Sequence, residues 1–129
     1  MARVLLIGIK PEVVDFSDPD LPPGITAEKI ASGIEATLAD MKARGWEAAF
    51  CAILADDSAE AKIASCLEQP WDCVVIGGGI RLPSRSLLLF ERVVNAVGRG
   101  APGTPIAFNT SPNDSADAAA RWLDGETTA

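Results

Sequence analysis

The sequence predicts a three-layer α/β sandwich in which helices cover both faces of a four-stranded parallel sheet. Four short apolar runs alternate along the chain with segments of helical periodicity. The runs do not alternate apolar with polar residues, which indicates strands covered on both faces. Right-handed crossovers limit the topology, and we expect strand order 2-1-3-4. We expect one α/β domain over residues 1–124 and a frayed tail over 125–129.

The predicted strands are the four apolar runs. The first is Arg3–Ile9, the second lies within 46–55 around AAFCAIL, the third is Cys73–Ile76 and the fourth spans 104–108. Pro105 cannot donate a hydrogen bond to a ladder. The fourth strand is therefore expected at an edge of the sheet.

Two helices are predicted in the first half of the chain. Thr26 is a suitable N-cap for the first helix, and Gly45 supplies its stop. Asp57 and Glu60 have the spacing of a capping box, which predicts a short second helix ending at Leu67.

Two more helices follow in the second half. One carries an apolar stripe over 87–97 and ends at Gly98. The last begins at Asp114 or Ser115 and carries Trp122. We expect this large aromatic residue in the core rather than on an interaction surface.

Charge and composition exclude several function classes. The formal net charge is −7 without any lysine or arginine block, so nucleic acid and anionic membrane surfaces are not expected partners. No apolar run approaches the roughly 18 residues of a membrane span. Histidine and tyrosine are absent, which excludes histidine-based triads and leaves acid–base chemistry to Asp, Glu, Lys or Cys.

The three cysteines predict a reducing compartment. Cys51, Cys66 and Cys73 are odd in number and show no CxxC spacing. We interpret them as small buried hydrophobic residues, two in strands and one in a helix. A cytoplasmic location follows as an expectation.

The predicted ligand site is the rim of the sheet at the carboxyl ends of its strands. Ligands of open α/β sheets bind there, where the strand order reverses. In this chain that point lies between the first and third strands, and it is flanked by the segments 10–24 and 77–84. The first segment holds four prolines and four acidic residues, which predicts a long functional or mobile loop.

Arg81 and Arg85 stand at the start of the third helix and are the strongest signal for a ligand. Two cations at the positive end of a helix dipole need a compensating negative charge. That charge is either an anionic ligand or a carboxylate of Asp15, Asp18 or Asp20, which would pin the loop to the rim. Both alternatives remain open.

The glycines Gly77, Gly78 and Gly79 are a weaker signal. GGGIRLPS matches neither the P-loop nor the dinucleotide fingerprint. The glycines are explained either by a phosphate cradle or by close packing of strand against helix. The candidate ligand-binding residues are Lys10, Gly78, Gly79, Arg81, Arg85, Asn109 and Ser111.

Asp15 and Asp18 are the candidate general acid or base residues if the protein is an enzyme. With Asp20 they resemble a metal loop only loosely, and solvated loop charge is the preferred interpretation. We therefore expect no metal, and the sequence identifies no cofactor.

The layout resembles response-regulator receiver domains and flavodoxins. Acidic residues follow the first strand, and Thr110 and Ser111 follow the fourth, as the receiver resemblance implies. The third strand, however, ends in glycines where receivers carry a phosphoacceptor aspartate, and no fifth strand exists. The chain also has GIKPE where flavodoxins have a Ser/Thr-Gly-rich phosphate loop. The resemblance therefore implies a fold and not receiver phosphochemistry.

Two functions follow as hypotheses. The first is binding of a small anionic metabolite, bearing phosphate or carboxylate, at the rim; whether the protein is an enzyme stays undecided. The second is a non-catalytic homodimeric interaction module. An open sheet has two edges, and the apolar second strand would need cover.

Overall fold

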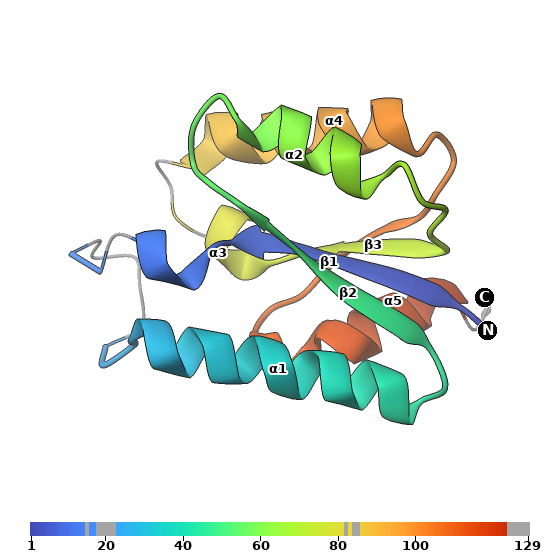
Figure 1. Cartoon of the computed structure of the whole chain (residues 1–129). Coiled ribbons are helices and arrows are strands. Elements are labelled where there is room, and N and C mark those ends of the chain that lie inside the picture. The colour runs from blue at the N-terminus through green and yellow to red at the C-terminus, as the bar shows by residue number, and fades with distance from the viewer. Residues whose placement is uncertain (15, 18–22, 82, 84–85, 124–129) are drawn as a thin grey trace.

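The predicted sandwich and strand order are confirmed. The computed structural model describes residues 1–14, 16–17, 23–81, 83 and 86–123. All strands pair in parallel, in the order β2-β1-β3-β4 (Figure 1). They are β1 (Arg3–Ile9), β2 (Glu47–Ile53), β3 (Cys73–Ile76) and β4 (Ile106–Phe108). The fourth strand is shorter than predicted and lies at an edge, as Pro105 indicated.

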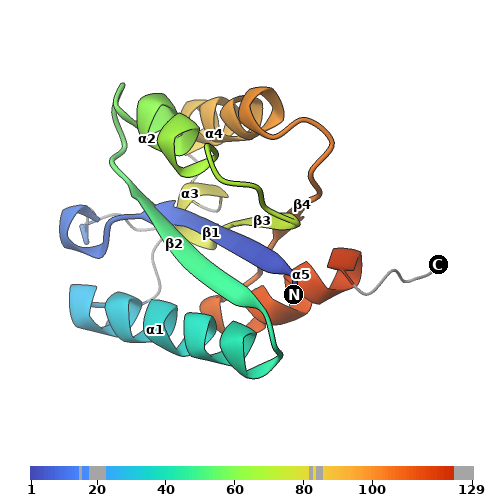
Figure 2. The ribbon, with the colours of Figure 1, turned by 45° about the vertical axis from the view of Figure 1, so that its right-hand side comes forward.

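Helices cover both faces of this twisted sheet (Figure 2). One face carries α1 (Ala27–Ala43) and α5 (Ser115–Leu123), and the other carries α2 (Ala59–Cys66) and α4 (Leu87–Gly100). The described residues also include the short helical segments η1 (Pro11–Val13), α3 (Gly78–Arg81) and η3 (Pro112–Asp114). The first of them lies inside the segment 10–24, which the sequence predicted to lack helix; Pro11 suits a first helical position, because its missing N–H is not needed there.

The core has two halves because every strand buries side chains on both faces. Towards α2 and α4 the buried residues are mostly Leu, Ile and Val. Towards α1 and α5 the cluster includes Met41 and the small residues Ala116, Ala118 and Ala119. Small side chains on α5 bring its backbone close to the sheet.

Local signals bound α1 as predicted. The Thr26 side chain accepts a hydrogen bond from Lys29 N at 3.2 Å, which is an N-cap contact. Gly45 follows the helix with a φ of +89°, a conformation that favours glycine.

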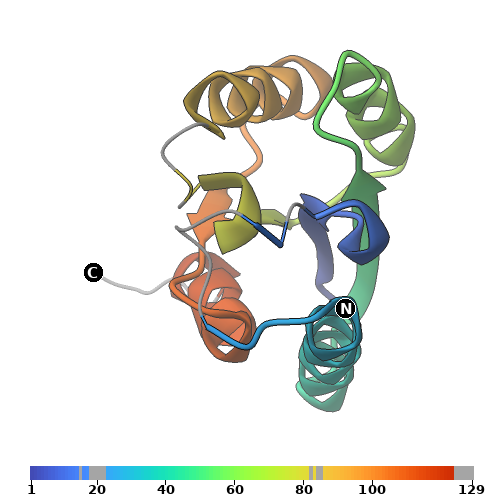
Figure 3. The same cartoon turned by 90° about the vertical axis from the view of Figure 1, so that its left-hand side faces the viewer.

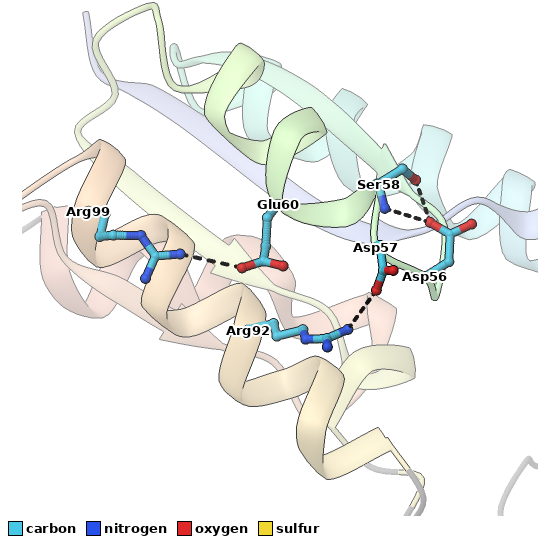
Figure 4. Close-up of polar contacts among 6 residues, drawn as sticks. All are labelled: Asp56, Asp57, Ser58, Glu60, Arg92 and Arg99. Carbon is cyan, nitrogen blue, oxygen red and sulfur yellow. Dashed lines mark hydrogen bonds and ion pairs between the residues drawn. The ribbon is translucent and has the colours of Figure 1, made fainter.

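The predicted capping box at α2 is wrong. Asp57, just before α2, and Glu60, within it, instead form surface ion pairs with side chains of α4 (Figure 4). Four contacts replace the box. Asp56 Oδ1 accepts hydrogen bonds from Ser58 N and Oγ at 2.8 and 2.5 Å. Arg92 pairs with Asp57 at 3.4 Å, and Arg99 pairs with Glu60 at 3.5 Å.

The prediction that Trp122 belongs to the core is also wrong. This side chain is 56% exposed near the end of α5. The alanines of the helix form its buried face, and Trp122 lies outside it. None of the helices among the described residues is long and apolar enough to cross a membrane.

Candidate functional site

The carboxyl ends of the strands meet at one rim, where β1 leads into η1 and β3 into α3 (Figure 3). Gly77 N donates to Ile7 O at 2.9 Å, which holds the start of α3 against the end of β1. Ile80 is completely buried and joins Ile7 and Ile76 in the core. The helix α3 therefore covers the point between β1 and β3 where the strand order reverses. Its last residue lies beside the end of β4, so the candidate site is there.

Arg81 is that side chain. Its Nη2 donates to the backbone oxygen of Asn109 at 2.5 Å, and its guanidinium lies 6.0 Å from the centre of the Phe108 ring. Its Nε is buried without a hydrogen-bond partner, and no carboxylate of the described residues lies within ion-pair distance. A buried donor without an acceptor costs free energy, so Arg81 Nε is a polar atom that the contacts of the described residues leave unexplained.

Asn109 contributes the second polar group of the site. The residue is 4% exposed, and its Nδ2 donates to Ser115 Oγ at 2.8 Å. Its Oδ1 is buried without a partner. Arg81 and Asn109 thus place an unpaired donor and an unpaired acceptor on two residues in direct contact.

The turn after β4 is folded around the carboxylate of Asp114. This carboxylate accepts hydrogen bonds from Thr110 N, from the Thr110 hydroxyl and from Ser111 N at 3.2 Å. Desolvation acts to raise the pKa of Asp114, but these hydrogen bonds outweigh it and hold the pKa below its ordinary value. The backbone donors of this turn are therefore already occupied by an anion of the chain itself.

The glycines of the rim do not adopt the left-handed conformation, since the described glycines with positive φ are Gly24, Gly45 and Gly103. A Cβ at Gly77 would lie 3.3 Å from Ile7 O, so close packing of β3 against β1 explains that glycine. A Cβ at Gly79 would meet no atom within 4 Å. The close contact at Gly77 is with the neighbouring strand and not the predicted contact of strand against helix, and Gly79 has no close contact among the described residues.

The structure brings together only part of the predicted ligand set. Arg81 and Asn109 are in contact, Ser111 follows in the same turn, and Gly78 and Gly79 belong to α3 with Arg81. Lys10 is exposed, and its backbone N donates to Ile53 O at the end of β2. The predicted residues Asp15, Asp18 and Arg85, and the alternative partner Asp20, lie outside the described residues.

Sequence reasoning missed the contribution of Phe108 and Ser115, which position Arg81 and Asn109. It also placed the whole stripe 87–97 against the core, whereas Leu87 and Leu88 are 63% and 59% exposed. These two residues begin α4, whereas Leu89 and Phe90 of the same turn pack against the core. Within the described part of the chain, no group of three Asp, Glu or Cys side chains could hold a metal ion.

The edge strand β2 is a second candidate region. Glu47 N donates to Ala2 O and Ile53 O accepts from Lys10 N, so the odd-numbered residues of β2 face β1. The N–H and C=O groups of Ala48, Phe50 and Ala52 therefore point away from the sheet. No neighbouring strand pairs with them among the described residues.

A pocket of about 440 Å³ lies beside the first residues of this edge. Trp46 and Trp71 line it together with Ala48 and Ala49. The Arg3 guanidinium lies 4.8 Å from the centre of the Trp71 ring, a cation–π contact that holds the indole in place. The open edge of β2 is therefore continued by a pocket that has two tryptophan side chains in its lining.

Comparison with known proteins adds no functional information. No protein-family model, curated protein or solved structure matches this chain. The function must be inferred from the two regions described above.

Proposed function

We propose that the rim beside β4 binds a small anionic metabolite that carries phosphate or carboxylate. The observation that supports this is the Arg81 side chain. It is partly buried, bound on one side by Asn109 and unpaired at Nε. A cation in a site of reduced polarity binds an anion more strongly than one in water.

The unpaired Oδ1 of Asn109 restricts the classes of ligand that fit the site. An anion that accepts from Arg81 and also carries a hydroxyl could donate to Asn109 Oδ1. Hydrogen phosphate, phosphate monoesters and hydroxy acids have this combination. Gly79, an exposed residue of α3, carries no side chain that would block the approach of such a group. The proposal is for binding, because no described group beside Arg81 identifies a reaction.

The test is a thermal-shift series with inorganic phosphate, a phosphate monoester and a hydroxy acid. Saturation to 100 times the dissociation constant stabilises a folded protein by about 2.7 kcal/mol. The shift should disappear in Arg81→Gln and persist in Arg99→Gln, which removes a surface cation from α4. The absence of any shift in the wild type, or equal shifts in both variants, would contradict anion binding at Arg81.

The β2 edge favours a second function, a homodimeric interaction module. Antiparallel pairing about Phe50 would place Ala48 opposite Ala52 of a second copy and use all the outward N–H and C=O groups. The same pairing would bring Lys42 and Arg44, before β2, near Asp56 and Asp57 after it. The middle of the β2 edge is apolar, basic residues precede it and acidic residues follow it. Two antiparallel copies of this edge are therefore complementary.

Light scattering over a range of concentrations tests the dimer. The wild type should approach twice the monomer mass of 13.5 kDa. Ala52→Lys puts a charge into the paired edge and should give the monomer mass. The control is Ala36→Lys, on the exposed side of α1, which should remain dimeric. A wild type that stays monomeric at high concentration argues against this function and leaves anion binding untouched.

A cytoplasmic location accompanies both proposals. The three free thiols support it, since structural disulfides form mainly in oxidising compartments.

A further inference from the structure

Cys51 and Cys66 are in direct contact although 15 residues separate them in the chain. Cys51 lies in β2 with its side chain towards α2, and Cys66 is the last residue of α2. The Sγ atoms of the two free thiols lie 2.7 Å apart. A disulfide bond is about 2.05 Å long, so a small approach of the two sulfurs would suffice to form one.

The surroundings hold the two thiols in this position. Ile63 of α2 and Val97 of α4 are buried in one core cluster, and the surface ion pairs Asp57–Arg92 and Glu60–Arg99 lie beside it (Figure 4). At the end of α2, Trp71 Nε1 donates to Cys66 O at 2.9 Å. Because helix and strand are both fixed, the thiols meet without any rearrangement of the fold.

The two thiols differ in access to solvent. Cys51 is completely buried, whereas Cys66 is partly exposed. Burial, followed by the hydrogen bond with Cys66, raises the pKa of the Cys51 thiol. Of the two residues only Cys66 has solvent exposure, so we expect an external reagent to react at Cys66 and Cys51 to react with Cys66.

We propose that Cys51 and Cys66 form a redox-active dithiol that exchanges with the disulfide of a small thiol and closes a bond between β2 and α2. This goes beyond both proposed functions and depends on neither. Cys73, buried on the opposite face of the sheet, takes no part.

The exchange has two balanced steps. The Cys66 thiol loses its proton to solvent, and the thiolate attacks one sulfur of the external disulfide. A mixed disulfide forms on Cys66, and one small thiolate leaves. Cys51 then loses its proton and attacks the Cys66 sulfur, releasing the second small thiolate. The protein dithiol loses two electrons and two protons, and the external disulfide becomes two thiols.

The experiment uses oxidised glutathione on the full chain, followed by alkylation and intact-mass measurement. The wild type should lose the mass of two hydrogens and retain no glutathione. Cys51→Ser should trap one glutathione on Cys66, Cys66→Ser should react with none, and Cys73→Ser should behave as the wild type. Peptide mapping without reduction should join the peptides that contain Cys51 and Cys66.

Two outcomes would overturn the proposal: a wild type that retains glutathione without closing the bond, or a Cys66→Ser chain that takes up glutathione at Cys51. Cys51→Ala serves as a second variant if the buried serine prevents folding. The closed bond should also raise the melting temperature of the wild type, by on the order of 10 °C for a loop of this length, and Cys66→Ser should show no rise.

Discussion

The two edges of the sheet are protected to very different degrees. At β4 the strand has three residues, Pro105 precedes it, and Arg121 Nη2 donates to the outward oxygen of Phe108 at 3.1 Å. At β2 the strand has seven residues, with no proline or charge from Ala48 to Ile53. Its outward backbone groups have no partner among the residues that the structure describes.

This difference separates the two proposed functions. The chain protects its β4 edge with its own side chains, and the polar rim with Arg81 and Asn109 lies at the end of that strand. It leaves the β2 edge uncovered, and that open edge is why we propose a second copy of the chain there. We therefore propose a ligand at the β4 edge of the sheet and a second copy of the chain at the β2 edge.

The largest effect on folding is expected at the β4 side from Asn109→Ala. The change removes the buried hydrogen bond to Ser115 Oγ and should lower the free energy of unfolding by about 1–3 kcal/mol in urea titrations. Asn113→Ala, at an exposed position of the following turn, should stay within about 0.5 kcal/mol of the wild type. Equal effects at both positions would show that Asn109 does not organise this edge.

A smaller effect is expected at the β2 side from Gly8→Ala. A Cβ there would lie 3.0 Å from Phe50 Cε1, so the ring must move outward at a cost of about 1 kcal/mol. Because Phe50 lies at the centre of the proposed interface, dimer dissociation measured by light scattering should also become easier.

Gly98→Ala is the control for Gly8→Ala. Its Cβ would meet no atom within 4 Å, and the helix should gain up to about 1 kcal/mol. A stabilised Gly8→Ala protein would mean that the ring at the β2 edge is not packed as described.

Arg121→Ala should cost about 0.5–1 kcal/mol, because it exposes the Phe108 oxygen that Arg121 now covers. Arg99→Ala, which removes only a surface ion pair, should change stability less in the same denaturant titration. An increase in the mass of Arg121→Ala measured by light scattering would mean that the β4 edge pairs with another chain once Arg121 no longer protects it, as we propose for the open β2 edge.

The smallest effect is a pH dependence that the turn after β4 contributes. The folded-state pKa of Asp114 lies below its ordinary value, so its stabilisation is present above about pH 4 and is lost as the pH falls through the folded pKa. The melting temperatures of the wild type and Asp114→Asn should therefore converge as the pH is lowered from about 4 through the folded-state pKa. A difference that stays constant over this range would contradict the role of the carboxylate.

The rim shows where sequence reasoning stopped. Parallel order alone predicted that Arg81 and Asn109 would meet, because both follow strands that end at the same rim. It did not predict that Ile80 would be buried at the point where the strand order reverses. Burial is predicted from a repeating pattern of apolar residues, and a single apolar residue in a glycine-rich turn has no such pattern. The Cys51–Cys66 contact was equally invisible, because no local spacing reports the register of a helix over a strand.

The sequence by itself determined the fold. Apolar runs marked the strands, Thr26 and Gly45 bounded the first helix, and Pro105 marked the edge strand. Each of these signals acts through residues that are neighbours in the chain. Tertiary structure alone decided which side chains lack partners and which thiols touch. Those properties depend on distances between residues far apart in the chain, and only the packed core sets them.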